Sequence, residues 1–345
     1  MTVYELDPLG DPRWTALVES HPLSSIFHTR EWLNALRQTY NYKLRAFTTS
    51  APGKVLSNGI VFCQVNSWLT GSRLVSLPFS DHCDPLVEST GDLEVLLSAV
   101  TEKAAGSYAH AEIRSRSVCF EAQSNFKLCS QYYLHALDLH PSLEEVYSHL
   151  HKDGMQRKIS RADRKRVIID QGRSECLLRE FYGLILMTHR RHQIPPQPLA
   201  WFENLIECCG SRVTIYVARV DDQPIGSMLT LRHKNSLVYK YGGSDKRFHS
   251  LGAMPRLFWQ AIQDAKSEQL LELDLGRSDQ NNEGLTQFKD RLGAARSSLE
   301  YWRSSGASAS EISERLPFRM AQRFLTRLPD RLFRLAGELF YRHVG

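Results

Sequence analysis

The chain of 345 residues carries the same order of secondary structure twice, and the second copy has the clearer pattern. Apolar residues alternate with other residues in its short strands, as expected where one face of a strand is buried. The helix has apolar residues every three or four positions between Met254 and Ala265. The predicted order is three strands, a helix and a strand, at 213–217, 225–231, 236–241, 254–265 and 270–275.

The first copy follows a helix predicted at 28–40. Its three strands, helix and strand are predicted at 43–49, 55–65, 73–79, 92–105 and 111–117. Two copies of one order indicate a tandem duplication. We therefore expect an α/β fold of two domains, each a mixed sheet with flanking helices. The predicted domains are residues 1–140 and 141–305, followed by a tail at 306–345.

The composition is that of a soluble globular protein, with 42% hydrophobic and 23% charged residues. A net charge of +5 argues only weakly for polyanionic partners. The seven cysteines include no CxxC pair, which favours a reducing compartment over a disulfide framework. The N-terminus lacks the basic and apolar regions of a signal peptide, and no apolar run reaches the roughly 20 residues of a membrane span. We expect a cytoplasmic protein.

The last strand of the second copy leads into a polar segment. Leu271, Leu273 and Leu275 alternate with acidic residues, the strand is predicted to end at Gly276, and a polar loop is expected at 277–281. Polar loops at strand ends often carry the chemistry of α/β proteins. The loop, with Asp274 before it and Lys289 at a predicted helix start, favours a pocket for an anionic or strongly hydrogen-bonding ligand. A solvated turn before a surface helix is the alternative.

Two further segments of the second half are candidates for phosphate binding. The loop that runs from Tyr241, Gly242 and Gly243 to Gly252 precedes a helix, where backbone N–H groups can face a phosphate. The segment 151–166 is rich in cations. Such a charge favours the phosphates of tRNA, a nucleotide-linked precursor, CoA or a lipid head group. The phosphate-binding candidates are Arg157, Lys158, Arg161, Lys165 and Gly252. A plain turn and a solvated helix face are the alternatives.

In the first copy, Asp81 and His82 open a loop that continues with Cys83 and Asp84. We expect Asp81 and His82 to line a pocket for substrate. Simple turn chemistry is the alternative, and metal binding would need further ligands from elsewhere in the chain. We therefore predict no metal site.

The tail pairs apolar helix faces with arginines. Phe318, Phe324 and Leu325 share a face, while Arg319, Arg323 and Arg327 repeat every four residues. A second apolar set follows Pro329, at Leu332, Phe333, Leu335, Ala336, Leu339 and Phe340. Such helices suit the surface of an anionic membrane at the inner face of the cell membrane. Packing against the body of the protein or a second subunit is the alternative.

Several passages resemble a known family. They are Ser25-Ile26-Phe27-His28-Thr29 with Glu31-Trp32, Leu77-Pro78-Phe79-Ser80-Asp81, the basic segment 155–165, and Asp274-Leu275-Gly276-Arg277 with Phe288-Lys289-Asp290. Their order, from residue 10 to about 303, resembles the Fem-type aminoacyltransferases and their relatives in the GCN5-related N-acetyltransferase (GNAT) superfamily. That resemblance implies two tandem GNAT-like domains, each with the order β-β-β-α-β.

The resemblance also implies a transferase that moves an acyl or aminoacyl group to an amine or a sugar-linked acceptor in peptidoglycan or exopolysaccharide synthesis. No serine-histidine-aspartate motif or glycosidase-type pair of carboxylates stands out, so direct attack by an amine on an activated carbonyl fits better. The resemblance implies a catalytic Lys289, since Fem-type enzymes carry a Phe-Lys pair here, and Asp274 is a candidate base. The predicted substrate-binding residues are Arg277, Ser278, Phe288, Tyr241, Gly242, Gly243, Asp81 and His82.

The donor stays open between aminoacyl-tRNA and acyl-CoA, with no tightly bound cofactor. The segment from Arg247 to Ala253 is only a degenerate match to the GNAT pyrophosphate loop. Fem-type enzymes have given up that loop, and this favours aminoacyl-tRNA. A non-catalytic binding or scaffold protein at a membrane-associated envelope complex is the rival class.

Overall fold

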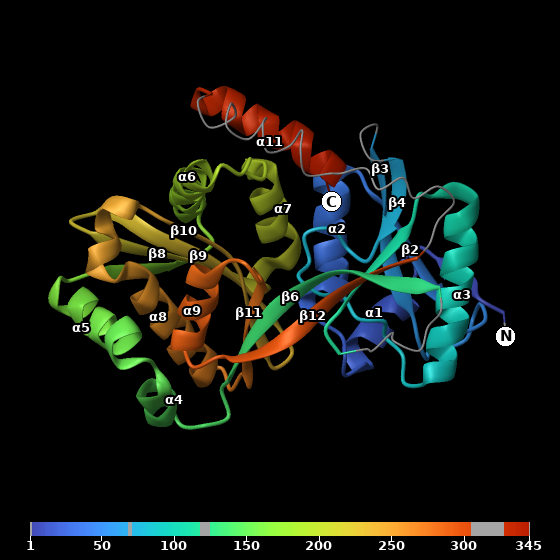
Figure 1. Ribbon diagram of the computed structural model, residues 1–345, viewed down its shortest axis with the longest axis horizontal. Coiled ribbons are helices and arrows are strands. Elements are labelled where there is room, and N and C mark those ends of the chain that lie inside the picture. Colours follow the sequence, from blue (N-terminus) through green and yellow to red (C-terminus); the bar gives the residue numbers. More distant parts are fainter. Residues whose placement is uncertain (1, 68–70, 118–124, 305–327, 345) are drawn as a thin grey trace. The chain divides into compact units, whose positions relative to one another are not determined.

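The structure of the protein is a computed structural model that describes residues 2–67, 71–117, 125–304 and 328–344 (Figure 1). These residues form two compact units. Unit 1 takes residues 2–131, 298–304 and 335–344 of the described chain, and unit 2 takes 132–297 and 328–334.

Unit 1 is a mixed sheet with helices on both faces. Its sheet has the order β1-β2-β3-β4-β5-β12. Strands β4 and β5 are parallel, and the pairs β1–β2, β2–β3, β3–β4 and β5–β12 are antiparallel. Helix α3 packs on Phe62, Leu74 and Ile113, and α2 lies on the opposite side of the strands (Figure 1). Its elements are β1 (Tyr4–Leu6), α1 (Pro12–Ser20), the 3₁₀ turn η1 (Ile26–His28), α2 (Arg30–Tyr40), β2 (Lys43–Thr48), β3 (Ile60–Ser67), β4 (Gly71–Val75), α3 (Thr90–Ser107), β5 (Ala111–Ser115) and the first half of β6 (Phe126–Asp138).

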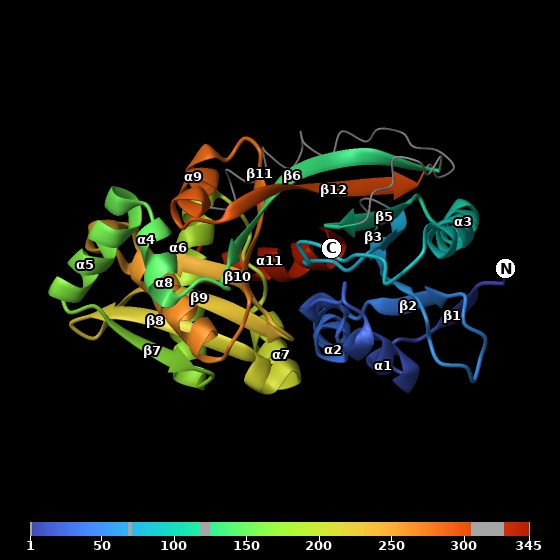
Figure 2. The same cartoon turned by 90° about the horizontal axis from the view of Figure 1, so that it is seen from below.

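Unit 2 repeats this plan with the sheet order β6-β11-β10-β9-β8-β7, in which β10 and β11 are parallel. In Figure 1 helices α6 and α8 lie on opposite sides of the strands, and Figure 2 shows the same unit from below. Its elements are α4 (Leu143–His149), the π-helical turn η2 (Lys152–Gln156), α5 (Arg157–Arg164), β7 (Ile168–Gly172), α6 (Glu175–His192), α7 (Leu199–Cys209), the 3₁₀ turn η3 (Gly210–Arg212), β8 (Val213–Val220), β9 (Gln223–His233), β10 (Ser236–Ser244), the 3₁₀ turn η4 (Lys246–Leu251), α8 (Ala253–Ser267), β11 (Glu272–Asp279), α9 (Glu283–Arg291) and the start of β12 (Ala295–Ser304).

The predicted apolar face of α8 is confirmed. Leu257, Phe258, Ala261, Ile262 and Ala265 are buried, and they share a core with residues of the sheet. Burial of each large apolar side chain in this set contributes roughly 1.5–3 kcal/mol to the stability of the fold. This face therefore fixes α8 against the sheet and sets the position of the loop before it.

The two copies exchange their last strands, which the sequence did not reveal. Residues of β6, at the end of the first copy, pair with β11 from Tyr132 to Asp138. Residues of β12, at the end of the second copy, pair with β5 from Glu300 to Arg303. The units therefore differ from the predicted domains 1–140 and 141–305, because a strand belongs to the sheet that supplies its hydrogen bonds.

Three predicted boundaries are wrong. Strand β11 does not end at Gly276 but continues to Asp279, because β6 supplies a new pairing partner there. Strand β4 ends at Val75 rather than residue 79, and β3 begins at Ile60 rather than residue 55. Strand β7 was not among the predicted strands.

Of the predicted tail, Phe318, Arg319, Arg323, Phe324, Leu325 and Arg327 lie outside the described residues. The described part forms α11 (Asp330–Val344). Phe333 is buried, while Leu332, Leu335 and Leu339 are 48%, 49% and 63% exposed. In the part of the chain that the structure describes, no helix has the length and apolarity needed to span a membrane.

Candidate active site

The two parallel strands of unit 2 pair over only three residues and then part. The register joins Ser236 to Glu272 and ends with Val238 beside Asp274. Beyond this point β10 has a bulge between Tyr239 and Tyr241, and β11 shifts its register against β6 after Asp274. Both strands continue past the last pair, so the backbone N–H and C=O groups that face each other there no longer pair between β10 and β11. A gap at the carboxyl ends of parallel strands is a common place for a ligand.

The bulge of β11 is held by side chains. Gly276 has a φ of +69°, a conformation that favours glycine, and its N–H donates to Asp274 Oδ1 at 2.7 Å. Lys289 Nζ donates to the carbonyl oxygens of Gly276 at 2.8 Å and Arg277 at 2.9 Å. The two predicted catalytic residues therefore meet at this bulge, and both are buried, at 1% exposed for Asp274 and 3% for Lys289.

The prediction that Lys289 lies at a helix start is wrong. It lies in the last turn of α9, and its ammonium points at the backbone of β11. A buried ammonium needs partners, and these two carbonyls supply them. A catalytic role for Lys289 stays a prediction, but the contacts give it a structural role in keeping the bulge open.

Three further residues near the bulge, Tyr133, His135 and Arg296, were not singled out in the sequence, and they gather around Asp290. His135 of β6 is fully buried, and its Nε2 lies 3.3 Å from Asp290 Oδ1 on α9. Arg296 pairs with Asp290 at 2.5 Å and stacks on Tyr133 with its guanidinium 4.7 Å from the ring centre. Burial, and then the positive charge of Lys289, lower the pKa of His135. No local signal in the sequence indicated this group, because it depends on the long-range pairing of β6 with β11.

The other predicted residues of this region have different surroundings. Arg277 is exposed, with its guanidinium 4.5 Å from the ring centre of Tyr132. Ser278 is 1% exposed, and within the described residues its hydroxyl makes no hydrogen bond. Phe288 packs against Phe258 in the core, at 5.4 Å between ring centres. Arg277 and Ser278 therefore remain candidates for substrate contact, while Phe288 has a packing role.

The predicted residues of β10 are tied to close packing. Tyr241 accepts a hydrogen bond from Trp201 Nε1 at 2.9 Å. A Cβ on Gly243 would lie 2.6 Å from the backbone of Leu184, so glycine lets α6 approach the strand. A Cβ on Gly242 would collide with the hydroxyl of Tyr239. Burial raises the pKa of Tyr239 to about 12, so this phenol at the parting of the strands stays protonated at neutral pH.

The loop between β10 and α8 uses its backbone donors internally. Asp245 Oδ1 caps the 3₁₀ turn by accepting from Arg247 N, and the N–H of Gly252 donates to His249 O. Gly252 has a φ of +81°, and a Cβ there would collide with the carbonyl oxygen of Lys158 on α5. The glycine is thus required by the turn and by the close approach of α5. Phosphate binding by its N–H stays a prediction.

Among the cations of α5 and its flanks, two predicted residues meet this loop. Arg161 Nη1 donates to Ser250 O at 3.1 Å, and Lys158 covers Gly252 with its backbone. Arg157 pairs with Asp153 at 2.6 Å on the surface, and Lys165 is exposed just after the helix. Met155 of η2 and the apolar side of α5, with Ile159 and Ala162, are buried in the core.

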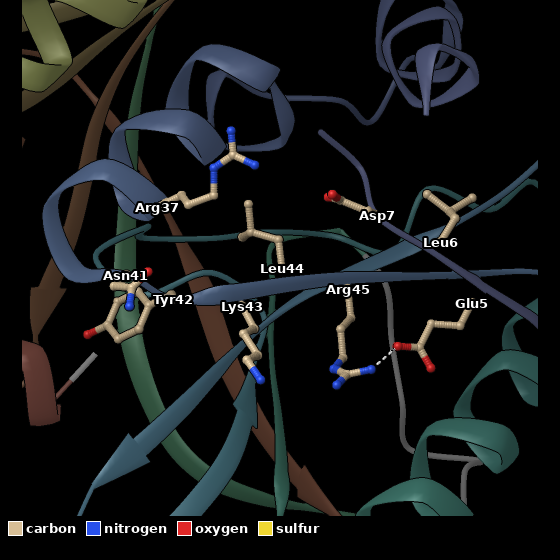
Figure 3. A pocket seen from close by; sticks show the side chains of 9 residues that line it. All are labelled: Glu5, Leu6, Asp7, Arg37, Asn41, Tyr42, Lys43, Leu44 and Arg45. Carbon is tan, nitrogen blue, oxygen red and sulfur yellow. Dashed lines mark hydrogen bonds and ion pairs between the residues drawn. The ribbon is translucent and has the colours of Figure 1, made fainter. Parts of the chain in front are cut away.

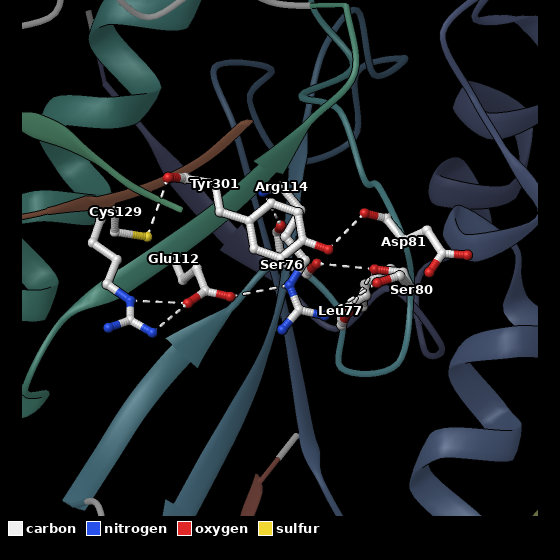
Figure 4. Close-up of polar contacts among 9 residues, drawn as sticks. Ser76, Leu77, Ser80, Asp81, Glu112, Arg114, Cys129 and Tyr301 are labelled. Carbon is white, nitrogen blue, oxygen red and sulfur yellow. Dashed lines mark hydrogen bonds and ion pairs between the residues drawn. The ribbon is translucent and has the colours of Figure 1, made fainter. Parts of the chain in front are cut away.

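In unit 1 the matching strand β4 ends at its last pair with β5, and polar side chains fill the region beyond it (Figure 4). Arg114 pairs with Glu112 at 3.0 Å and donates to the carbonyl oxygens of Leu77 and Ser80, each at 3.2 Å. Arg303 pairs with the other side of Glu112 at 2.9 Å. Burial opposes ionisation, but the charges of Arg114 and Arg303 outweigh it and lower the pKa of Glu112 to about 2.

Asp81 and His82 lie in the loop that this network holds. Tyr301 donates its hydroxyl hydrogen to Asp81 O at 2.8 Å. His82 is 4% exposed and packs edge-on against Phe27 at 5.3 Å between ring centres. Substrate binding by this pair stays a prediction, and the burial of His82 gives it a packing role.

A shallow pocket of about 560 Å³ lies elsewhere on unit 1 (Figure 3). It is lined by Glu5, Leu6, Asp7, Arg37, Asn41, Tyr42, Lys43, Leu44 and Arg45. Its charges are mixed, and Arg45 is already paired with Glu5. None of the predicted site residues lines it. Across the described ranges, no group of three or more His, Cys, Asp or Glu residues could hold a metal ion.

Residues 151–290 match the family described as the Acetyltransferase (GNAT) domain. This part of the chain includes the parting strands β10 and β11 and the helix α9. This part of the chain is therefore similar to a GNAT domain. A comparison with curated proteins finds no match.

Solved structures show where the whole fold belongs. "Crystal structure of FemX" is similar with a TM-score of 0.68 and 13% identity, covering 87% of this chain and 97% of that one. The L-PGS structure from Bacillus licheniformis gives 0.58 and 14%, with 92% and 98% covered. A tandem GNAT protein from the clavulanic acid biosynthesis pathway gives 0.54 and 10%, with 89% and 100% covered. The chain thus has a tandem GNAT fold similar to that of FemX.

Proposed function

We propose that the protein is an acyl- or aminoacyltransferase whose unit 2 holds the activated acyl group in the gap between β10 and β11. The parting of these strands after Val238 and Asp274 is the observation that carries the proposal. Backbone groups released there can bind the acyl carbonyl as an extra strand would. Unit 1 offers no equivalent gap in its described residues, because Arg114 and Glu112 occupy it.

The reaction needs positioning, an oxyanion donor and a path for one proton. The nitrogen of an amine acceptor forms a bond to the acyl carbon, and the bond from that carbon to the oxygen or sulfur of the carrier breaks. The proton lost by the amine goes to the leaving atom. Tyr239, protonated and next to the gap, is the proposed donor of that proton, and the acceptor amine replaces it afterwards. Asp274 holds Gly276 N, so it shapes the bulge in this scheme.

We propose aminoacyl-tRNA as the donor. Acyl-CoA would be held at the start of α8 by free backbone N–H groups. Here the donors of Arg247 and Gly252 are used inside the turn, Pro255 lacks an N–H, and α5 covers Gly252. The proposed acceptor is the amine of a cell-envelope glycan precursor, an assignment carried from the resemblance to Fem-type enzymes.

Transfer assays with the full chain test the proposal. Labelled aminoacyl-tRNA and acyl-CoA are offered separately with a panel of amine acceptors, including sugar-linked peptides. We expect transfer from aminoacyl-tRNA, and Tyr239→Phe should lower kcat by about a hundredfold because general acid catalysis contributes that much. Tyr147→Phe, in the same core, is the matched control. Transfer from acyl-CoA alone would overturn the donor assignment, and transfer from neither would favour the non-catalytic class.

A further inference from the structure

His135 of β6 lies opposite the bulge of β11, which forms one side of the proposed gap for the acyl group. The pairing of β6 with β11 is interrupted between Ala136 and Leu134. In this interruption β6 has one residue, His135, while β11 has two, Leu275 and Gly276. A bulge of two residues against one changes the direction of nearby side chains and is frequent next to active sites. His135 is therefore the one residue of β6 that lies beside the irregular part of β11.

The imidazole of His135 points toward α9. Its Nε2 lies 3.3 Å from Oδ1 of Asp290 on that helix. The preceding residue, Lys289, donates from Nζ to the carbonyl oxygens of Gly276 and Arg277. Both His135 and Lys289 are buried. The strand and the helix thus bring an imidazole and an ammonium to the same bulge.

Packing alone does not explain a histidine at this position. His135 is fully buried, and neither of its ring nitrogens makes a hydrogen bond of good geometry within the described residues. A buried polar group in this state costs free energy, whereas an apolar side chain of similar size does not. We therefore expect the histidine to serve the site rather than the stability of the core.

The charges around the imidazole favour its neutral form. Burial lowers the pKa of His135 most, the charge of Lys289 lowers it further, and Arg296 adds to this effect. Asp290 raises that pKa but does not outweigh them, and Tyr133 packs edge-on against the ring at 6.5 Å between centres. A proton on His135 would add a second positive charge beside the ammonium, and the repulsion between them is strong in a buried region. Protonation would therefore weaken the hold of Lys289 on β11.

We infer that His135 is a positioning residue for the proposed transfer, and that its neutral form keeps the β11 side of the gap in the shape that binds the acyl donor. The inference rests on the proposed function, because it concerns the same gap. His135 acts through Lys289, which holds the carbonyl oxygens of the bulge, and it does not need to touch the donor. We therefore expect the affinity for the donor to fall in mild acid.

Transfer by the full chain, measured against pH with labelled aminoacyl-tRNA, tests this role. The variant is His135→Gln, which cannot take up a proton. The control is His140→Gln, which removes a surface histidine of unit 2 that also lies close to an aspartate, at 2.6 Å from Asp138. The acceptor amine gains protons in acid as well, but this affects all three proteins equally.

In the wild type and the control, KM for the donor should rise as the pH falls from about 7.5 to about 5.5, while kcat is affected much less. The rise should not exceed about tenfold, because a histidine with the ordinary pKa of 6.5 is about nine-tenths protonated at a pH of about 5.5, and the pKa of His135 is lower. At neutral pH, His135→Gln should bind the donor more weakly than the wild type, because an amide fills less space than an imidazole, but its KM should be nearly independent of pH. An equal acid rise in His135→Gln, or no rise in the wild type, would overturn the inference and leave the proposed function intact.

A second measurement does not depend on transfer. In the full chain, the NMR signals of the His135 ring, assigned by their loss in His135→Gln, are followed against pH. Lys289→Met should raise the pKa of His135, and Asp290→Asn should lower it, because the two neighbours act in opposite directions. If Lys289→Met leaves this titration unchanged, the coupling is absent and the inference fails. Transfer from no donor would instead overturn the proposed function, and the role of His135 in transfer with it, while the NMR shifts would still show the coupling.

Discussion

Removal of the Lys289 ammonium should destabilise unit 2, contrary to what its position in the sequence predicted. The side chain is 3% exposed, and its Nζ donates to two carbonyl oxygens of β11. Hydrogen bonds that involve a charged group contribute about 1.5–3 kcal/mol each. The variant no longer has to desolvate an ammonium on folding, and this offsets part of that loss. For Lys289→Ala we therefore expect a net loss of about 3 kcal/mol in the free energy of unfolding, including the small cavity left by the stem.

This magnitude is large against the total stability of a domain, which is about 5–15 kcal/mol. For a body the size of unit 2, about 3 kcal/mol corresponds to a fall in Tm of roughly 6–12 °C. Lys289→Met keeps the apolar stem and removes only the donors, so we expect about 2 kcal/mol. The difference between the two variants measures the packing of the stem.

The assay is urea and thermal unfolding of the full chain, followed by circular dichroism. Lys152→Ala is the control, because Lys152 is an exposed lysine of the same unit and should change stability by less than about 0.5 kcal/mol. Activity is then measured well below Tm, so that a loss of transfer in folded Lys289→Met reports the position of the bulge. If Lys289→Ala unfolds at the same urea concentration as Lys152→Ala, the structural role of Lys289 is refuted.

Three other outcomes follow from the structure. The depressed pKa of Glu112 stabilises unit 1 at pH values above the ordinary pKa of 4.5. About 3 kcal/mol of the free energy of unfolding should be lost as the pH falls from 4.5 toward 2. In acid unfolding, Glu112→Gln should show a flatter pH dependence, and at pH 7 it should be less stable than the wild type. Gly252→Ala should cost about 2 kcal/mol in urea unfolding because of its φ of +81° and the carbonyl of Lys158, whereas Gly183→Ala, with open space around it, should be neutral or stabilising. If the exposed leucines of α11 contact an anionic membrane, full-length protein should float with anionic vesicles, and Leu332→Ser with Leu335→Ser and Leu339→Ser should stay in solution; equal flotation of both would refute the contact.

The repeated order of elements was predictable because it rests on local patterns. The strand β8 and the apolar face of α8 depend on residues within one element, and both are confirmed, although β8 is buried on both faces rather than on one. The exchange of β6 and β12 depends on pairing between segments more than 100 residues apart. A strand's own sequence states that one face is buried but not which strand lies beside it.

The same limit explains the candidate site. Asp274 and Lys289 were predictable as a pair because they flank one loop, but the burial of Lys289 depends on α9 lying over the bulge that β6 creates. His135 and Asp290 come together through that exchanged strand. Arg191 and His249 lie 58 positions apart and meet only at Ser244. The sequence alone does not tell whether a charged side chain contacts other residues or only solvent, because that depends on its neighbours in space.

The two copies of the fold have diverged at the same place, and this divergence supports a division of labour. In each copy the third strand and the closing strand are parallel and pair over two or three residues. In unit 1 a buried carboxylate between two arginines ties those strands to the loop with Leu77 and Ser80. Separation of Glu112 from Arg114 would leave a buried charge unpaired at a cost of about 3–5 kcal/mol. A ligand that enters that region would have to supply this free energy. In unit 2 the same place holds Tyr239 and two bulges. The copy that kept the gap is therefore the one we assign to the acyl donor.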